Sequence, residues 1–350
     1  MIPRLLPAAV LALAALAFAG APPASAPATA QAYASDGIAF ETYLEVLKAR
    51  ARSEGVSAAT VERMTAGLTP NPRVIQLDRN QPGSATVRGY PPLAPYIATH
   101  VDVSRIGGGR SVYAQHRDQL ARIERETGVP GAIIVAIFGH ETSYGRVKGD
   151  FDLARSLATL AWEGRRRELF ASEFVAVLKI ADKGFAREQL VGSYAGAFGN
   201  PQFLPSVYLR LATDGDGDGR ADIFSNRADT FASIANYFRD AGWRAGQPWG
   251  VRASVPGGFN VEAYKTRLAA PLCPRVHERL SVWKTVAEWR ALGVVAQRGL
   301  GDEVMVSLFQ PDGPVAPAWL LTGNYRAILE YNCSNYYAMS VGLLADEIVN

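Results

Sequence analysis

The sequence is poor in the residues that zinc chemistry requires. It holds two cysteines and four histidines among its 350 residues. Zinc in proteins is bound mainly by clusters of cysteine and histidine, and a zinc-protease helix that begins with His-Glu needs a second histidine four residues after the first. His140-Glu141 is followed at that position by Tyr144. Composition and spacing therefore argue against a catalytic zinc ion.

Neither sign of charge dominates the chain. Its 36 basic and 33 acidic residues give a formal net charge of +3. The arginines are dispersed, whereas nucleic-acid-binding proteins gather them on one face or in one stretch. The balance excludes a nucleic-acid partner and is compatible with a polyanionic wall or membrane surface. A Gly-x-Ser-x-Gly motif is also lacking, and neither Ser193 nor Ser206 has a recognisable His–Asp pair, which argues against a serine nucleophile.

Long hydrophobic runs are lacking except for one at the N-terminus. Leu5 to Ala21 follows the single charge of Arg4, and small residues come after it. This pattern predicts a signal peptide over residues 1–30, cleaved after Ala30 or, as a second choice, after Ala34; a membrane anchor is the alternative. A lipid anchor is not expected because no cysteine follows the run. We therefore expect an exported, soluble protein of charge about +2, without a transmembrane segment after cleavage.

The two cysteines, Cys273 and Cys333, are expected in an oxidising compartment. They form either a disulfide or a pair of buried thiols that act as small apolar side chains.

Apolar spacing predicts a mainly helical chain with a smaller β-rich part. The stretches around Pro70, Pro82 and Pro91 are rich in turn residues. Three ranges have strand composition and lie in a β-rich insertion at about 250–322: 250–255, 304–310 and 318–321. Helices are predicted over 40–52, 57–66, 113–126, 131–140, 156–162, 165–182, 206–211, 230–241, 285–292 and 336–349.

Glu141 is the best candidate for a catalytic acid. It stands at the end of the strongly apolar helix predicted over 131–140, just before a turn with Gly145. Packing against apolar neighbours would desolvate the carboxylate and raise its pKa, as a general acid requires. The alternative is a helix-end glutamate paired with Arg146 or Lys148.

An acidic loop predicts a calcium site. Asp214-Gly-Asp216-Gly-Asp218-Gly219 follows the spacing of an EF-hand loop, in which the sixth position is glycine and the seventh, here Arg220, offers its carbonyl. Ser225 replaces the glutamate of position twelve, and Asp229 is the candidate to complete the shell. The alternative is a solvated acidic turn.

The order of motifs resembles the lytic murein transglycosylase B family over about 36–346. The matching residues are Gly139-His-Glu141-Thr-Ser-Tyr-Gly-Arg146, Leu157-Ala-Thr-Leu160 with Arg165-Arg166, Gly192-Ser193-Tyr-Ala-Gly-Ala-Phe-Gly199 with Gln202-Phe-Leu-Pro-Ser206, the acidic loop 214–229, Ala235-Asn-Tyr237-Phe, Gly242-Trp243, Tyr331-Asn332 and Tyr337-Ala-Met339. Two departures are His140, where an apolar residue is common, and Asn200-Pro201 before Gln202.

The resemblance implies an α+β, mainly α fold: a lysozyme-like helical core with an additional α subdomain, the β-rich insertion and an EF-hand-like loop, all in one catalytic domain over 31–350. It implies a periplasmic enzyme that cuts the β-1,4 bond between N-acetylmuramic acid and N-acetylglucosamine of peptidoglycan and leaves a 1,6-anhydro ring. By the same resemblance Glu141 is catalytic, a structural calcium ion is bound by Asp214, Asp216, Asp218, Arg220 and Asp229, and substrate is contacted by Ser193, Gln202, Tyr237, Asn332, Tyr337, Arg165 and Arg166.

One carboxylate suffices for this chemistry. Glycoside hydrolysis ordinarily uses two, whereas a transglycosylase uses the C6 hydroxyl of the sugar in place of water. A lysozyme-type hydrolase and a non-catalytic wall-binding protein are the alternatives. No organic cofactor is expected, and the sequence does not identify partners among wall-synthesis proteins.

Overall fold

The computed structural model describes residues 37–81, 90–266, 274–277 and 279–350. The predicted signal peptide and Cys273 lie outside these residues. Two compact units divide the chain: unit 1 contains the described residues of Gly89–His140 and Ile234–Asn350, and unit 2 those of Phe18–Arg88 and Glu141–Ser233. Within the described ranges, no helix combines the length and apolar character needed to cross a membrane.

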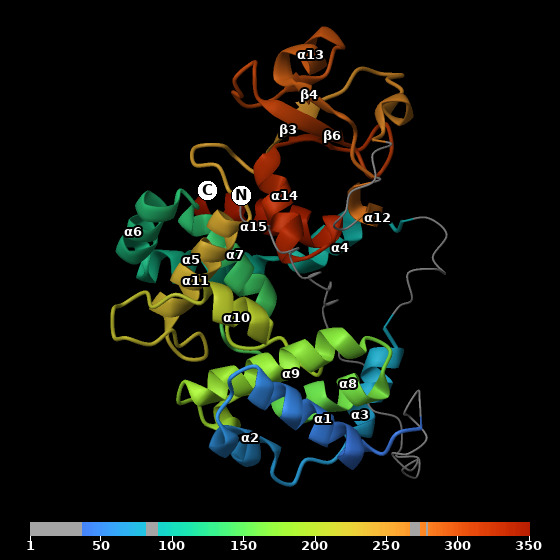
Figure 1. Cartoon of the computed structure of the whole chain (residues 1–350). Coiled ribbons are helices and arrows are strands. Elements are labelled where there is room, and N and C mark those ends of the chain that lie inside the picture. Colours follow the sequence, from blue (N-terminus) through green and yellow to red (C-terminus); the bar gives the residue numbers. More distant parts are fainter. Residues whose placement is uncertain (1–36, 82–89, 267–273, 278) are drawn as a thin grey trace, which may run out of the picture. The chain divides into compact units, whose positions relative to one another are not determined.

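Unit 2 is built around two helices that pack on each other, α8 (Leu153–Glu163) and α9 (Arg167–Asp182) (Figure 1). Asp152 begins α8 as its N-cap, accepting from the backbone N–H of Arg155 at 3.0 Å, and Gly164 ends it with a φ of 96°. Strand β1 (Phe151–Asp152), just before α8, pairs antiparallel with strand β2 (Val191–Gly192), which follows α9. The helices that lie within this unit are α1 (Phe40–Ser53), α2 (Ala58–Thr65), α3 (Pro72–Arg79), α8 (Leu153–Glu163), α9 (Arg167–Asp182) and α10 (Pro205–Leu211), with a 3-10 turn at Arg187–Gln189.

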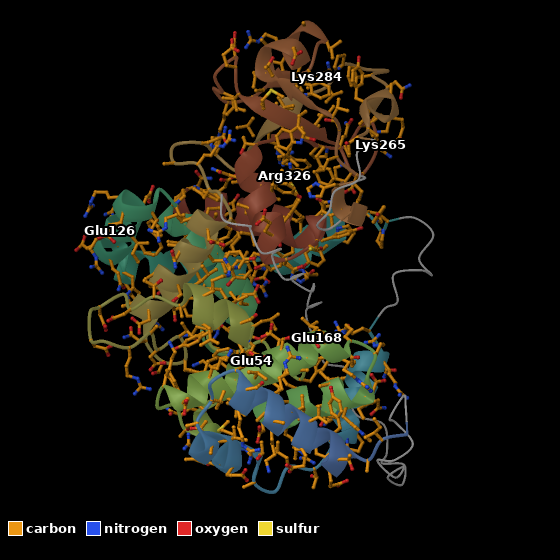
Figure 2. The ribbon with its side chains drawn as sticks, viewed as in Figure 1. Glu54, Glu126, Glu168, Lys265, Lys284 and Arg326 are labelled. Carbon is orange, nitrogen blue, oxygen red and sulfur yellow. The ribbon has the colours of Figure 1, made fainter. Side chains whose placement is uncertain are left out.

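Ion pairs on the surface of unit 2 connect α1 with α9. Arg50 contacts Glu54 one turn later at 2.9 Å and Glu168 of α9 at 2.8 Å. Both glutamates are labelled in Figure 2. Exposed pairs of this kind contribute about 0–1 kcal/mol, so the buried apolar side chains between the helices dominate the stability of this unit.

Unit 1 contains the remaining helices and a five-stranded antiparallel sheet. Two helices, α7 (Gly131–Thr142) and α11 (Arg227–Asp240), run across the division between the units. The other helices of unit 1 are α4 (Leu93–His100), α5 (Val103–Gln115), α6 (Arg117–Thr127), α12 (Pro274–His277), α13 (Val286–Ala291), α14 (Gly323–Tyr331) and α15 (Asn335–Val349), with a 3-10 turn at Val261–Tyr264.

The sheet confirms the predicted β-rich insertion. Its strand order is β4-β6-β7-β3-β5, and α13 lies beside it (Figure 1). Trp289 of α13 is fully buried in a cluster that includes Val251 and Leu320. This cluster gives the insertion a hydrophobic core of its own. The strands are β3 (Gly250–Ser254), β4 (Trp283–Thr285), β5 (Val295–Ala296), β6 (Met305–Phe309) and β7 (Ala318–Leu321).

Most predicted helices are confirmed within a few residues, and several differences are plain, among them α14, over which no helix was predicted. The helix predicted over 113–126 is wrong as a single element, because the chain changes helix at His116, between α5 and α6. The prediction of turns around Pro70 and Pro82 missed α3 between them, and the prediction of a turn around Pro91 missed α4. Proline is tolerated in the first turn of a helix, and Pro72 and Pro95 stand in the first turns of α3 and α4.

Candidate active site

Glu141 lies on the last turn of α7, where a buried helix ends. Every residue of α7 from Gly131 to Gly139 is buried, whereas Glu141 is half-buried. The next residues turn sharply: Ser143 and Tyr144 have φ angles of 50° and 62°. Non-glycine residues in this left-handed region cost on the order of 1–3 kcal/mol and cluster at functional sites. The backbone is therefore constrained directly behind the carboxylate.

Thr142 holds this turn in place. Its buried hydroxyl accepts from the backbone N–H of Gly145 at 3.1 Å and donates to the carbonyl of Asn200 at 3.3 Å. The two cations proposed as alternative partners of Glu141 are used elsewhere: Arg146 donates to the Ser143 carbonyl and Lys148 to the Phe224 carbonyl. The catalytic role of Glu141 and its alternative as a helix-end glutamate paired with one of these cations both stay predictions.

The glycine-rich loop around Ser193 forms a tight turn in unit 2. The Ser193 hydroxyl accepts from the N–H of Ala197 at 3.0 Å, and the Ser193 N–H donates to the Ala197 carbonyl at 2.7 Å. Gly196 has a φ of 100°, a backbone conformation that favours glycine over residues with a side chain. Within the described part of the chain, the hydroxyl hydrogen of Ser193 has no acceptor and is available to a ligand.

Gln202 stands at the end of this loop with a φ of 51°. It is the third described non-glycine residue with a positive φ; the other two, Ser143 and Tyr144, follow Glu141 by two and three residues. Its side-chain nitrogen donates to the Gly199 carbonyl at 2.9 Å. The loop continues into α10, which contains Ser206. The buried Glu173 of α9 accepts from the N–H and from the hydroxyl of Ser206 at 2.9 and 2.6 Å.

Arg165 and Arg166 follow α8 in unit 2, and both contact the carboxylate of Asp78 at the end of α3. Asp78 is buried. Because a turn was predicted at Asp78, this residue was not identified from the sequence as a buried partner of the arginines. The i, i+1, i+4 spacing of Val74, Ile75 and Asp78 on one helix face is the signal that could have found it.

Three candidate substrate contacts belong to unit 1: Tyr237 on α11, Asn332 directly after α14, and Tyr337 on α15. The Tyr237 hydroxyl donates to the carbonyl of Glu330 at 2.7 Å, and its ring packs 4.6 Å from that of Tyr331. Asn332 follows α14; its side-chain oxygen is buried and has no hydrogen-bond donor among the described residues. A buried acceptor without a partner is costly, and a donor on a ligand would satisfy it.

Tyr337 lies in the first turn of α15, whose N-cap Ser334 accepts from its backbone N–H at 3.3 Å. Its ring is 5.6 Å from the ring of His140. His140 shares a hydrogen bond with Arg105, Nη1 to Nδ1 at 3.1 Å. Burial lowers the pKa of His140 to about 3, and the charge of Arg105 adds to this effect. The imidazole is therefore neutral beside the catalytic candidate Glu141.

The acidic loop gathers three carboxylates of unit 2. One oxygen from each of Asp214, Asp216 and Asp229 lies within 4.8 Å of the others. Burial raises the pKa of Asp229, and the charges of Asp216 and Asp214 raise it further. Asp218, which was predicted with them, lies outside this group and accepts from the N–H of Arg220 at 2.8 Å. A divalent cation with oxygen ligands would relieve the repulsion within the group.

Cys333 stands next to Asn332 and is disulfide-bonded. The sequence holds one other cysteine, Cys273, which lies outside the described residues.

Comparison with known proteins shows the family. The family model described as "Transglycosylase SLT domain" matches residues 39–346. The membrane-bound lytic murein transglycosylase B of Escherichia coli is 32% identical over 284 residues, which cover 79% of this chain and 73% of that protein.

Two solved structures agree with this assignment. SltB3 from Pseudomonas aeruginosa, in complex with NAG-anhNAM-pentapeptide, superposes with a TM-score of 0.79 at 36% identity, covering 89% of this chain and 80% of that one. The Escherichia coli lytic transglycosylase SLT35, in complex with calcium, superposes with a TM-score of 0.71 at 27% identity, covering 89% and 92%. The chain therefore belongs to the transglycosylase SLT domain family and is a lytic murein transglycosylase, an enzyme that cleaves peptidoglycan.

Proposed function

We propose that Glu141 is the single general acid and base of this enzyme. Its carboxylic acid protonates the glycosidic oxygen as the β-1,4 bond between N-acetylmuramic acid and N-acetylglucosamine breaks. The resulting carboxylate then accepts the proton of the C6 hydroxyl, whose oxygen attacks C1 of the same sugar and closes the 1,6-anhydro ring. The observation that carries this proposal is the position of Glu141 in the last turn of a buried helix, two residues before the left-handed pair Ser143 and Tyr144.

A single carboxylate is enough because the acceptor is part of the substrate. The water that a hydrolase must activate on the opposite face of the sugar is not needed. The N-acetyl group of the substrate stabilises the cationic centre. The candidate to hold that group is either Ser193 of unit 2 or Asn332 of unit 1. Among the described residues, the Ser193 hydroxyl hydrogen has no acceptor and the buried Asn332 oxygen has no donor.

The other substrate contacts are proposed from the family resemblance and the local structure. Gln202 lies in the glycine-rich loop and has a positive φ. Tyr237 packs against Tyr331, and Tyr337 lies near His140. Tyrosine rings give flat surfaces for sugars. Arg165 and Arg166 supply guanidinium groups for the wall peptide or sugar. The ligand bound in the SltB3 structure, NAG-anhNAM-pentapeptide, supports peptidoglycan strands as the binding partner of this chain.

A structural calcium ion is proposed at the acidic loop, with no organic cofactor. Asp214, Asp216 and Asp229 supply three carboxylate oxygens, and Asp218 and the Arg220 carbonyl are proposed to complete the shell. Calcium prefers six to eight oxygen ligands, and the calcium complex of SLT35 supports the same metal here. The ion would hold α10 and α11 together at the loop that joins them, and no step of the reaction passes through it.

We place the enzyme in the periplasm, as an exported protein released by cleavage of the segment 1–30. The support is the pattern of Arg4, the apolar run and the small residues after it, together with a substrate class that belongs to the cell wall.

The test is a Glu141→Gln variant assayed on purified sacculi. The amide keeps the shape of the side chain but neither donates nor accepts the proton, so muropeptide release should fall by about 10²–10⁴-fold or more, with melting temperature and sacculus binding unchanged. Mass spectrometry of the wild-type products should show 1,6-anhydro ends; reducing ends would identify a lysozyme-type hydrolase instead. Activity of Glu141→Gln within a few-fold of wild type would refute the assignment.

A further inference from the structure

Five charged side chains of unit 2 meet where the end of α3 lies against the end of α8. Asp78 and Arg79 close α3, and Glu163 closes α8. Gly164 then reverses the chain with a φ of 96°, which places Arg165 and Arg166 beside α3. The cluster combines three arginines with two carboxylates, and its formal charge is positive.

The carboxylate of Asp78 contacts both arginines of the pair. Oδ2 accepts from Nε of Arg165 at 2.9 Å and from Nη2 of the same side chain. Oδ1 accepts from Nη2 of Arg166. The backbone carbonyl of Asp78 takes a further bond from Arg165 Nη2 at 2.6 Å. Two guanidinium groups repel each other, so a carboxylate between them both neutralises part of that repulsion and fixes their spacing.

Glu163 also binds arginines of this cluster. Its Oε1 accepts from Nε of Arg79 at 3.0 Å, and its Oε2 accepts from the backbone N–H of Arg165 at 3.0 Å. The Asp78 and Glu163 side chains are 1% and 6% exposed, whereas those of Arg165 and Arg79 are 43% and 46% exposed. The two carboxylates are thus buried while Arg165 and Arg79 reach solvent, so the exposed surface of this cluster is cationic.

The bonds to Asp78 leave specific donors unused. Arginine carries five N–H groups in a planar fork. With Nε and Nη2 of Arg165 bound to Asp78, its Nη1 has no acceptor within the described part of the chain, and the same is true of Nη1 of Arg166. The Arg166 guanidinium also rests 4.7 Å above the ring of Phe170. Each guanidinium group is thus held by Asp78 through part of its donors. The Arg165 side chain is 43% exposed and the Arg166 side chain 20%, and Nε of Arg166 is buried without a partner among the described residues.

The cluster lies close to the glycine-rich loop of the same unit. Gln81, three residues after Asp78, donates to the hydroxyl of Tyr194 at 2.5 Å. Burial raises the pKa of Tyr194. The charge of Asp78 raises it further, whereas the charges of Arg166 and Arg165 lower it. Tyr194 is the neighbour of Ser193, a proposed substrate contact, so a ligand at Ser193 has the arginine pair within its surroundings.

We propose that Asp78 is a positioning residue for recognition of the stem peptide: its buried carboxylate aligns Arg165 and Arg166 so that their open N–H groups bind a carboxylate of the peptide. This inference rests on the proposed role of the two arginines as substrate contacts. Asp78 itself is covered and does not touch substrate. It acts through the arginines, so it affects binding of peptide-bearing strands and not the chemical step.

The experiment compares Asp78→Asn with wild type on two substrates: glycan strands with stem peptides, and the same strands after an amidase has removed the peptides. Asparagine keeps the volume but removes the charge that holds the forks. On peptide-bearing strands KM should rise about tenfold, the loss expected for one charge-assisted contact, with kcat within twofold. On peptide-free strands both constants should stay within twofold of wild type.

Asp152→Asn is the matched control, because Asp152 also pairs with an arginine of unit 2, Arg187, at 2.7 Å, and should leave the ratio of the two KM values unchanged. Asp78→Glu keeps the charge but displaces it by one methylene, so it should give the same peptide-dependent rise in KM at a smaller size. It decides the question if Asp78→Asn does not fold.

Arg165→Ala distinguishes the positioning role of Asp78 from the arginine contact itself. If it raises KM for peptide-bearing strands while Asp78→Asn and Asp78→Glu do not, the positioning role is refuted and the arginine contact stands. If Arg165→Ala has no effect on either substrate, the proposed arginine contact itself fails. Equal effects of Asp78→Asn on both substrates would also overturn the proposal, since that pattern belongs to a residue that only stabilises the fold.

Discussion

The hydroxyl of Thr142 joins the turn behind Glu141 to the loop that carries Gln202, through a 3.3 Å hydrogen bond to the carbonyl of Asn200. Thr142 is buried, and its oxygen also accepts from the N–H of Gly145. One side chain therefore fixes the strained turn and ties it to a second candidate segment. We expect this connection to help fix the position of the Glu141 carboxylate.

Thr142→Val should lower kcat by about tenfold, with a smaller change in KM. Valine has nearly the shape of threonine but leaves the Asn200 carbonyl and the Gly145 N–H without their partner, which should also cost about 1–3 kcal/mol of the free energy of unfolding. Thr142→Ser, which keeps the hydroxyl, is the control for kcat. Muropeptide release and chemical denaturation measure the two effects; a Thr142→Val enzyme with wild-type kcat would show that the bond is structural only.

Local sequence signals drew attention to Glu141 and to the acidic loop because each is contained in a short segment, and the family resemblance then favoured a catalytic role for Glu141. An unbroken apolar run predicts a buried helix, and its end places Glu141. The alternating aspartates of 214–218 are equally local. Both could be found without knowledge of tertiary contacts.

Long-range partners could not be found in this way. Asp78 and Arg165 are 87 residues apart in sequence, and nothing near Asp78 indicates that its carboxylate is buried against arginines. Helix α5 was only partly predicted because it contains three consecutive glycines, which have low helix propensity; it packs on α15, a contact that no local pattern displays. Asn332 was assigned from family resemblance, and its unsatisfied buried oxygen is visible only in the structure.

His140 should make the wild-type enzyme more sensitive to acid than a His140→Phe variant. The pKa of about 3 in the folded state lies below the ordinary value of about 6.5 that applies to the unfolded chain. Between these values the unfolded state binds a proton that the folded state does not, so stability is fully present above pH 6.5 and is lost as the pH falls toward 3.

Melting temperatures measured between pH 7.5 and 4 test this expectation. The difference between wild type and His140→Phe at pH 7.5, where both side chains are uncharged, gives the packing effect of the substitution. That difference should shift in favour of His140→Phe at each lower pH. Parallel curves for the two proteins would mean that His140 titrates in the folded state much as it does in the unfolded chain.

Calcium should raise the melting temperature of the purified enzyme, and EDTA should lower it. An ion that binds only the folded state stabilises it by RT ln(1 + [L]/Kd), about 2.7 kcal/mol at a hundred times Kd. Asp216→Ala removes one of the three grouped carboxylates and should abolish the calcium response. Asp240→Ala, at the other end of α11, is the control and should retain it. A melting temperature indifferent to calcium, EDTA and Asp216→Ala alike would reject the site.

Reduction of the disulfide at Cys333 should lower both stability and activity. The predicted partner is Cys273, and a bridge between them closes a loop of about 60 residues, which in the chain-entropy model contributes roughly 4 kcal/mol less any strain. Cys333 is adjacent to Asn332, whose buried oxygen is proposed to meet the substrate. Loss of the bridge should therefore loosen that residue and raise KM as well as lower the melting temperature.

Mass spectrometry of the non-reduced, alkylated protein from an oxidising compartment tests the pairing of Cys333 with Cys273. One cross-linked peptide containing both cysteines is expected, and two alkylated cysteines would contradict it. The double variant Cys273→Ser/Cys333→Ser should reproduce the effects of reduction and be insensitive to reductant. If reduction lowered the activity of this double variant as well, the loss would have a cause other than the disulfide, because the sequence contains no further cysteine.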